Sequence, residues 1–400
     1  VSVGVWIGAG SRYETQEQNG ISHFIEHMLF KGTKKRSARD IACEIDGIGG
    51  QINAFTGKDC TCIYTTTLDT GLETAVDVLS DMLFNSVFDP DQIETEKNII
   101  LEEISMYEDD PEELVNDILN EEIWCEGPLG YPILGTEKSL KKLSRENIIQ
   151  YMADYYNPDN CVISIVGNFH EDKLLEILQK YFGAWKPLTY CRLSLERPVF
   201  KSGFLFRKKE IEQTHICMGF KGVPMNDGRL YSLWVLNNII AGGISSRLFQ
   251  DIREESGLVY NIYSFITSFR DCGMFTIYAA AKADRAGLVI ESVRNEICNL
   301  LTGGINDGEL RRSRDQLKGT FILGLDSTLG RMSSLGKSKI TTGIVRSPEY
   351  VLKRIDGVNT DSVMEMADLL FSRGNIGITV LGETPVPNSV LDGFKFDYDA

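Results

Sequence analysis

The chain has 400 residues, of which 42% are hydrophobic and 24% are charged, values typical of an ordinary soluble globular protein with two or three domains. Its 41 basic and 57 acidic residues give a net charge of −16, which disfavours nonspecific nucleic-acid binding. No apolar run reaches the roughly eighteen residues of a membrane-spanning helix, so no membrane partner is expected.

The N-terminal residues alternate in hydrophobicity with a period of two from Val1 to Ile7, which predicts a strand. The chain begins inside this strand and without Met, so we expect that a segment upstream is missing. A second strand region is predicted from Ile52 to Leu68, broken by a turn near Gly57–Cys60.

Between these strands, two of the four histidines, His23 and His27, lie four residues apart in an apolar run. Residues at this spacing share one face of a helix, so both imidazoles can point at one metal ion. Glu26 lies on the same turn, and the order His-x-x-Glu-His reverses the H-E-x-x-H arrangement of zinc peptidases. Two satisfied buried histidines are the alternative, but a carboxylate on a buried helix needs a partner, and a metal is the simplest.

A catalytic zinc site needs a third protein ligand, and the obvious donors lie on the helix predicted between Asp91 and Met106. Glu96 and Glu103 are two turns apart and share one stripe, whereas Glu102 is rotated off it. Spacing alone does not choose among them. Acidic residues continue to Glu126, either as a solvated helical face or as an acidic wall that attracts basic peptides.

Several segments recur at an offset of 214 or 215 residues, for example Met152-Ala153-Asp154 as Met366-Ala367-Asp368. Two homologous halves are therefore predicted: domains at 1–187 and 206–400, joined by a polar linker at 188–205. Each half alternates strands with longer helices, which favours an α+β fold of two α/β rolls, each a mainly antiparallel sheet packed against helices. The second half has no histidine in the helix expected around 231–240, so only the first half holds a metal site.

The chain resembles the inverted-motif zinc peptidases pitrilysin, insulysin and mitochondrial processing peptidase. The resemblance rests on the motif from His23 to His27 with Glu103, and on the sequence segments His23–Thr33 and Asn53–Thr56. The resemblance covers nearly the whole chain and is closest to the short processing-peptidase-like members. It implies that His23, His27 and Glu103 bind one Zn²⁺ ion per chain and that Glu26 is the general base, with Glu96 as a supporting residue.

The resemblance assigns roles to two further segments. Asn53, Ala54 and Phe55 would form an edge strand to which substrate adds as an extra strand. Arg253 and Tyr260, seven residues apart in the second half, would hold the substrate carbonyl. Without the resemblance, the first segment is an ordinary strand, Arg253 a surface charge and Tyr260 a strand residue.

We therefore expect a zinc endopeptidase that cleaves peptides or unfolded segments in a dimeric chamber, most simply a homodimer, with a heterodimer as the alternative. Nine cysteines without a C-x-x-C pair suggest a reducing compartment, so a cytoplasmic location is expected. A non-catalytic scaffold or core subunit is the main rival, because some relatives keep the fold and lose the ligands. A metal-dependent hydrolase of another bond is a weaker rival.

Overall fold

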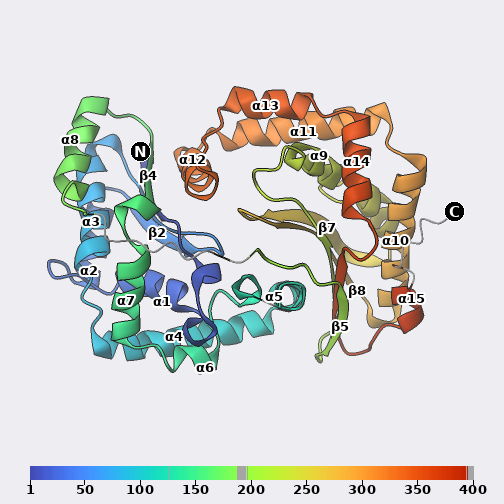
Figure 1. The fold of residues 1–400 in the computed structure, drawn as a ribbon, viewed down its shortest axis with the longest axis horizontal. Coiled ribbons are helices and arrows are strands. Elements are labelled where there is room, and N and C mark those ends of the chain that lie inside the picture. The colour runs from blue at the N-terminus through green and yellow to red at the C-terminus, as the bar shows by residue number, and fades with distance from the viewer. Residues whose placement is uncertain (126, 187–194, 196, 393, 395–400) are drawn as a thin grey trace. The chain divides into compact units, whose positions relative to one another are not determined.

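The computed structural model describes residues 1–125, 127–186, 195, 197–392 and 394 (Figure 1). Part of the predicted linker, at 188–194 and 196, lies outside these residues. The chain forms two compact units, and each gathers segments from both halves of the sequence. Unit 1 comprises Val1–Met106, Tyr131–Glu196 and Leu323–Arg346, and unit 2 comprises Tyr107–Gly130, Arg197–Ile322 and Ser347–Ala400. The domain boundaries at 1–187 and 206–400 follow the sequence repeat and stay a prediction.

Unit 1 is built on a four-stranded sheet in the order β2-β3-β1-β4, with every pair antiparallel. Its elements are β1 (Ser2–Ile7), α1 (Ile21–Leu29), α2 (Ala38–Gly47), β2 (Gln51–Thr56), β3 (Thr61–Thr66), α3 (Leu72–Asn85), α4 (Pro90–Asp109, which runs on into unit 2), α6 (Glu137–Leu140), α7 (Arg145–Tyr155), β4 (Cys161–Val166), α8 (Glu171–Phe182) and α12 (Thr328–Thr342). Strand β1 matches the strand predicted at 1–7. Strands β2 and β3 match the region predicted at 52–68, with the turn near Gly57–Cys60 between them.

The central strand β1 is buried on both faces. Val3, Val5 and Ile7 contribute to the main core beneath helices such as α1 and α3, because alternate side chains of a strand point to the same face. Trp6 points to the other face, where it joins a small core with Met332 of α12. This second core explains why every residue of β1 is hidden from solvent.

Unit 2 contains a five-stranded sheet in the order β5-β9-β6-β8-β7, in which only the β5–β9 pair is parallel. Its elements are α5 (Pro111–Ile123), β5 (Gly203–Lys208), β6 (Thr214–Lys221), α9 (Leu230–Ile240), a π-helix (Phe249–Glu255), β7 (Val259–Ser268), β8 (Gly273–Ala281), α10 (Ala286–Gly303), α11 (Asp307–Gly324, whose last residues belong to unit 1), α13 (Pro348–Asp356), α14 (Thr360–Leu370), β9 (Ile376–Gly382) and α15 (Asn388–Asp392).

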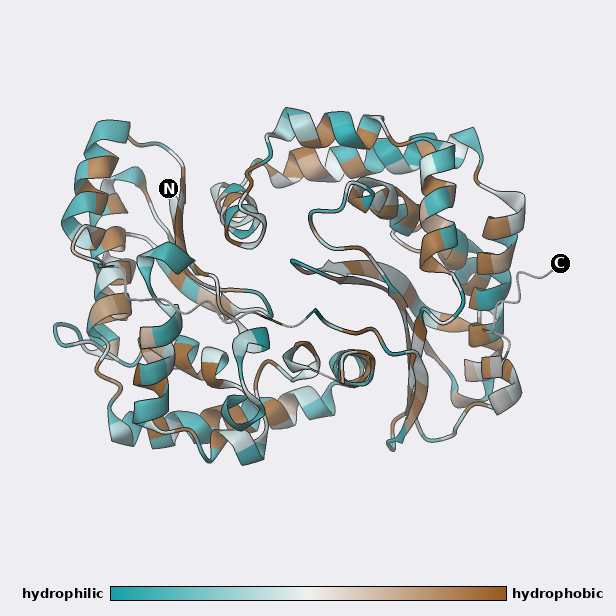
Figure 2. Cartoon of the chain, viewed as in Figure 1, coloured by the Kyte–Doolittle hydropathy of each residue, from teal (hydrophilic) through white to brown (hydrophobic). Residues whose placement is uncertain are grey.

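The two halves of the sequence exchange a helix. Helix α5, from the first half of the sequence, packs on β5, β6 and β9 of unit 2, and α12, from the second half, packs on β1 and β4 of unit 1. Each sheet thus has its main core on one face and a single helix from the other half on its second face. In Figure 2 the helices carry alternating brown and teal bands, as expected of amphipathic helices that bury one side.

Helix α12 packs closely on the unit 1 sheet because a glycine lies on each side of the contact. At Gly336 of α12 an added Cβ would overlap the indole of Trp6, and at Gly4 of β1 it would overlap the Met332 side chain. These glycines therefore set how near the helix backbone lies to the strand. Ser164 adds a hydrogen bond by donating its hydroxyl to the carbonyl of Met332 at 2.9 Å.

The mixture of helices with two mainly antiparallel sheets confirms the predicted α+β class. Within the described chain, every helix is too short or too polar to cross a membrane.

Candidate metal centre and active site

Helix α1 carries both histidines of the sequence motif. It starts after Gly20, which has a left-handed φ of 93°, and its first N–H groups are satisfied by a buried carboxylate: Glu14 accepts hydrogen bonds from the backbone of Gly20 at 2.7 Å and of Ser22 at 2.9 Å. The helix is buried along most of its length, so the side chains of His23 and His27 emerge at a defined position.

The His23 and His27 rings lie beside each other, with centroids 4.5 Å apart. Glu103 of α4 faces both, because its Oε2 lies 3.8 Å from His23 Nε2 and 3.7 Å from His27 Nε2. One ligand atom from each of the three residues lies within 4.8 Å of the others. Ligand atoms on a tetrahedral zinc ion with bonds of about 2.1 Å would be about 3.4 Å apart, so the group fits such an ion after a small contraction.

Glu96, one heptad before Glu103, lies behind the histidines. Its Oε1 is 2.8 Å from His27 Nδ1, and its Oε2 forms an ion pair with Lys31 at 2.6 Å. Burial acts to raise the pKa of Glu96, but the hydrogen bonds from His27 and Lys31 outweigh it and lower the pKa. An ionised Glu96 holds the proton of His27 on Nδ1 and leaves Nε2 as the lone-pair donor, as metal-binding histidines require.

The protonation states of the two histidines differ. Burial and the nearby His27 lower the pKa of His23 to about 4, so its ring is neutral and able to bind a metal at pH 7. Burial also acts to lower the pKa of His27, but Glu96, Glu103 and Glu26 together raise it. Protons therefore compete with a metal mainly at His27.

Glu26 points from α1 toward strand β2, where the Thr56 hydroxyl donates a hydrogen bond of 2.5 Å to Glu26 Oε2. Burial raises the pKa of Glu26, although Thr56 and His27 act to lower it. A carboxyl with a raised pKa is better matched to proton transfer near neutral pH. One of its oxygens is fixed by Thr56.

Strand β2 holds Asn53, Ala54 and Phe55 at the edge of the unit 1 sheet. Among the described strands it pairs only with β3, and its residues alternate between exposed and half-buried. Phe55 packs edge-on against Trp6, with centroids 5.5 Å apart. The other edge of β2 therefore has no strand partner within the part of the chain that the structure describes.

Arg253 and Tyr260 belong to unit 2. Arg253 lies on the π-helix, with its guanidinium 4.6 Å from the centre of the Phe249 ring. Tyr260 sits at a β-bulge at the start of β7 and is 75% exposed. Tyr260 is thus accessible to a ligand, whereas Arg253 is half-buried.

The sequence patterns assign no role to Thr56 or Lys31. Their partners, Glu26 and Glu96, are 30 and 65 positions away in the sequence, and no helical or strand period links such residues. For Glu26 the available signal was a carboxylate on a helix predicted to be buried, which needs a hydrogen-bond partner.

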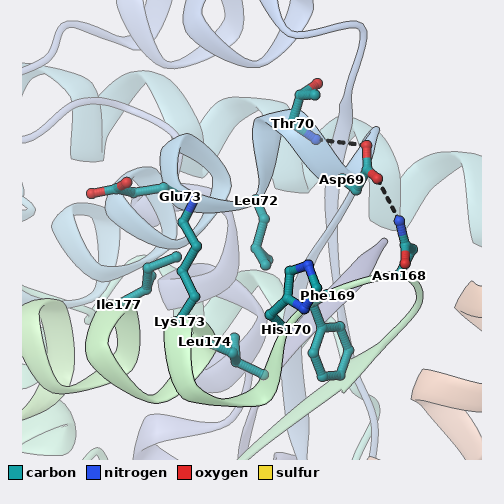
Figure 3. Close-up of a pocket in the computed structure, with 10 residues that line it drawn as sticks. All are labelled: Asp69, Thr70, Leu72, Glu73, Asn168, Phe169, His170, Lys173, Leu174 and Ile177. Atoms are coloured by element: carbon teal, nitrogen blue, oxygen red, sulfur yellow. Dashed lines mark hydrogen bonds between the residues drawn. The ribbon is translucent and has the colours of Figure 1, made fainter.

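A separate hollow of about 300 Å³ lies in unit 1 beside the start of α8 (Figure 3). Asp69 there is already engaged by Asn168 at 2.6 Å and by the Thr70 backbone at 2.9 Å. Among the described residues, the histidines and Glu103 alone form a group of at least three metal-ligand side chains. The hollow in Figure 3 is therefore not a second metal site of that kind.

Comparison with known proteins matches both halves of the chain. Residues 1–137 match the family model described as insulinase (peptidase family M16), and residues 142–317 match the peptidase M16 inactive domain. An uncharacterized zinc protease, YmxG of Bacillus subtilis, is 45% identical over 93% of this chain and 90% of its own length. A second, from Streptomyces coelicolor, is 37% identical over 94% of this chain and 83% of its own length.

Solved structures share the fold at low sequence identity. A protease from Helicobacter pylori superposes with a TM-score of 0.89 at 19% identity, covering 95% of this chain and 93% of that one. A peptidase M16 inactive domain from Pseudomonas fluorescens gives 0.89 at 20% identity, covering 96% and 93%. A chain of complex III from Candida albicans gives 0.84 at 21% identity, covering 98% and 94%. With matching models over most of its length and a relative at 45% identity, the chain belongs to the M16 peptidase family.

Proposed function

We propose that this protein is a zinc-dependent endopeptidase that cleaves peptides or unfolded polypeptide segments. The observation that carries the proposal is the group of His23, His27 and Glu103, whose ligand atoms lie within 4.8 Å of one another. The Glu26 carboxylate lies on the same helix as the two histidines. The donor set of two imidazoles and one carboxylate is that of a catalytic zinc site with one open position. The zinc-protease names of the relatives support the choice of metal. One ion per chain is proposed because the described residues form one such ligand group.

In this proposal each residue has a defined task. His23 and His27 hold the metal through Nε2 and Glu103 through Oε2, while Glu96 keeps the His27 tautomer that leaves Nε2 free. When bound, zinc supplies Lewis-acid activation of a water molecule and of the scissile carbonyl. Glu26 accepts the proton of the attacking water and later delivers it to the leaving amine.

The substrate is bound by its backbone. It adds to the edge of β2 that pairs with no other described strand, at Asn53, Ala54 and Phe55, and main-chain pairing of this kind accepts many sequences. Arg253 and Tyr260 steady the oxygen of the scissile carbonyl by donating hydrogen bonds to it. The working form is a homodimer that encloses the substrate, and light scattering of the purified protein tests this. Exposed thiols at Cys43, Cys125 and Cys298 support a reducing, cytoplasmic location.

The test combines zinc content with cleavage of an internally quenched peptide. We expect one zinc per chain and activity that a chelator abolishes and zinc restores. Glu26→Gln should keep the zinc and lower kcat by about a thousandfold. His27→Ala should lose both. Glu103→Gln should bind zinc poorly, while Glu102→Gln, on the exposed face of the same helix, is the matched control and should behave as the wild type.

A non-catalytic scaffold is the second candidate, because two structural relatives are an inactive M16 domain and a chain of complex III. The presence of His23, Glu26, His27 and Glu103 together favours the enzyme. A zinc-free protein without peptidase activity, or a Glu26→Gln variant as active as the wild type, would contradict the proposed role.

A further inference from the structure

A pocket of about 460 Å³ in unit 2 has an unusual charge for so acidic a protein. It lies between the start of α9 and the helices α13 and α14. Three basic side chains line it, and Glu365 is the one acidic residue in the lining; the basic residues are Arg229, Lys353 and Arg354. The local excess of positive charge therefore runs against the net charge of −16 for the whole chain.

Two of the three cations are held in place. Arg354 lies over the Tyr231 ring at 5.2 Å and donates a hydrogen bond of 2.6 Å to the carbonyl of Gly228. Arg229 is fixed by Asp227, which accepts hydrogen bonds from its Nε at 2.9 Å and its Nη2 at 2.6 Å. Each guanidinium has further N–H groups beyond those these contacts use, and little side-chain entropy is left to lose on binding a ligand.

The third cation, the Lys353 ammonium group, has no hydrogen-bond or ion-pair partner among the described residues. Next to it, Tyr350 is 46% exposed although it lines a pocket. The floor beneath them is fixed, because Arg314 of α11 donates hydrogen bonds of 3.1 Å to the carbonyls of Asp356 and Val358 at the α13–α14 turn. The pocket thus combines fixed guanidiniums, an unpaired ammonium and an available aromatic face.

We propose that this pocket binds a small organic anion: a phosphate or carboxylate group on an aromatic body. Guanidinium groups match these anions in geometry, and the lysine adds a point charge. The Tyr350 ring offers a face for stacking a planar group. The volume lies within the range of small-molecule sites. This site is independent of the proposed peptidase activity, because all its residues lie in unit 2 and none has a role at the metal centre.

The experiment is isothermal titration calorimetry of the full-length protein at physiological ionic strength, where weak surface attraction is screened. The probes are phenyl phosphate and benzoate, with inorganic phosphate as the anion without a ring and benzylamine as the cationic control. We expect phenyl phosphate or benzoate to bind with a Kd of roughly 0.1–1 mM, inorganic phosphate more weakly, and benzylamine not at all.

Variants separate the charge from the ring. Lys353→Ala should weaken phenyl phosphate binding about fivefold to tenfold, whereas Lys138→Ala, which removes another exposed lysine in unit 1, should leave it unchanged. Tyr350→Ala should weaken phenyl phosphate but not inorganic phosphate. Thermal unfolding of each variant checks that the fold is retained.

Three outcomes overturn the proposal. The first is the absence of binding heat from either aromatic anion up to about 10 mM. The second is an equal loss of phenyl phosphate affinity in the Lys353 and Lys138 variants, which would indicate diffuse attraction, and the third is benzylamine binding as tight as that of phenyl phosphate. Whether phenyl phosphate or benzoate binds more tightly tells which anionic group the pocket favours.

Discussion

At the scale of single residues, the Thr56 hydroxyl holds the carboxylate that we propose as the general base. The hydrogen bond of 2.5 Å from Thr56 leaves Glu26 with one oxygen in a fixed direction. The role of Thr56 depends on the proposed peptidase activity, but a separate measurement tests it. A hydrogen bond to a charged group contributes about 1.5–3 kcal/mol, which corresponds to a rate factor of about ten to a hundred.

We therefore expect Thr56→Val to lower kcat about tenfold to a hundredfold with little change in KM or zinc content. Thr56→Ser keeps the hydroxyl and should stay within a few-fold of the wild type. Steady-state kinetics with a quenched peptide, beside zinc analysis, measures both. A valine variant with wild-type kcat would remove Thr56 from the mechanism, whereas an inactive wild type would reject the peptidase proposal itself.

Glu14, the carboxylate beneath the start of α1, should make stability depend on pH. Burial raises its pKa to about 7, although hydrogen bonds from Ser22, Gly20 and Asn19 act to lower it. The unfolded chain titrates this group near 4.5, so the folded protein binds the proton more tightly. The contribution to stability is full below about pH 4.5 and is lost as the pH rises through about 7.

Glu14→Gln removes this titration. Between pH 5 and 7.5 the free energy of unfolding of the wild type should fall by on the order of 2 kcal/mol relative to that of the variant. Urea unfolding at the two pH values measures the difference, and the other titrating groups cancel because both proteins share them. Parallel pH dependences in the two proteins would show that Glu14 does not titrate in this range.

Part of the site follows from local spacing and part does not. The interval of four between His23 and His27 places both rings on one face of α1 wherever that helix packs, so the sequence alone predicts their proximity. Spacing does not distinguish Glu103 from the other carboxylates of its helix, and only the family resemblance selects it. The contacts of Thr56 and Lys31 depend on how β2 and α4 pack around α1, which no local pattern encodes.

At the scale of elements, the glycine at position 336 sets the approach of α12 to the unit 1 sheet. A Cβ there would overlap the buried Trp6 indole, which has no room to move because it is fully buried. Overpacking of this kind typically costs 1–3 kcal/mol, more than the helix propensity of alanine returns.

We expect Gly336→Ala to lower the free energy of unfolding by about 1–3 kcal/mol. The matched control is Gly319→Ala in α11, where nothing lies within 4 Å of the added Cβ and where alanine should stabilise the helix by up to about 1 kcal/mol. Chemical denaturation of the two variants provides the comparison. If both alanines had the same effect, the close approach of α12 would not be a determinant of stability.

At the scale of the whole molecule, the sequence repeat predicts two similar units but not which sheet each helix covers. In the structure β8 is buried at all nine of its residues, so it needs a covering layer on both faces. Nothing in the sequence says that α5 and α12 come from the opposite halves. That exchange depends on chain connectivity in three dimensions, and the repeat offset is the same whether or not it occurs.

The exchange makes each half of the sequence incomplete by itself. Fragment 1–196 lacks α12, so one face of β1, including Trp6, would lie open, and fragment 197–400 lacks α5, which covers β5, β6 and β9. We expect neither fragment to unfold cooperatively alone and the two to form a one-to-one complex when coexpressed. Circular dichroism, tryptophan fluorescence and light scattering measure this.

The intact chain, cut by a protease at a site inserted within 187–194, is the control and should stay together. A fragment that folds alone with the stability of the intact chain would mean that the exchanged helices are dispensable, because its sheet would then be stable with one face uncovered.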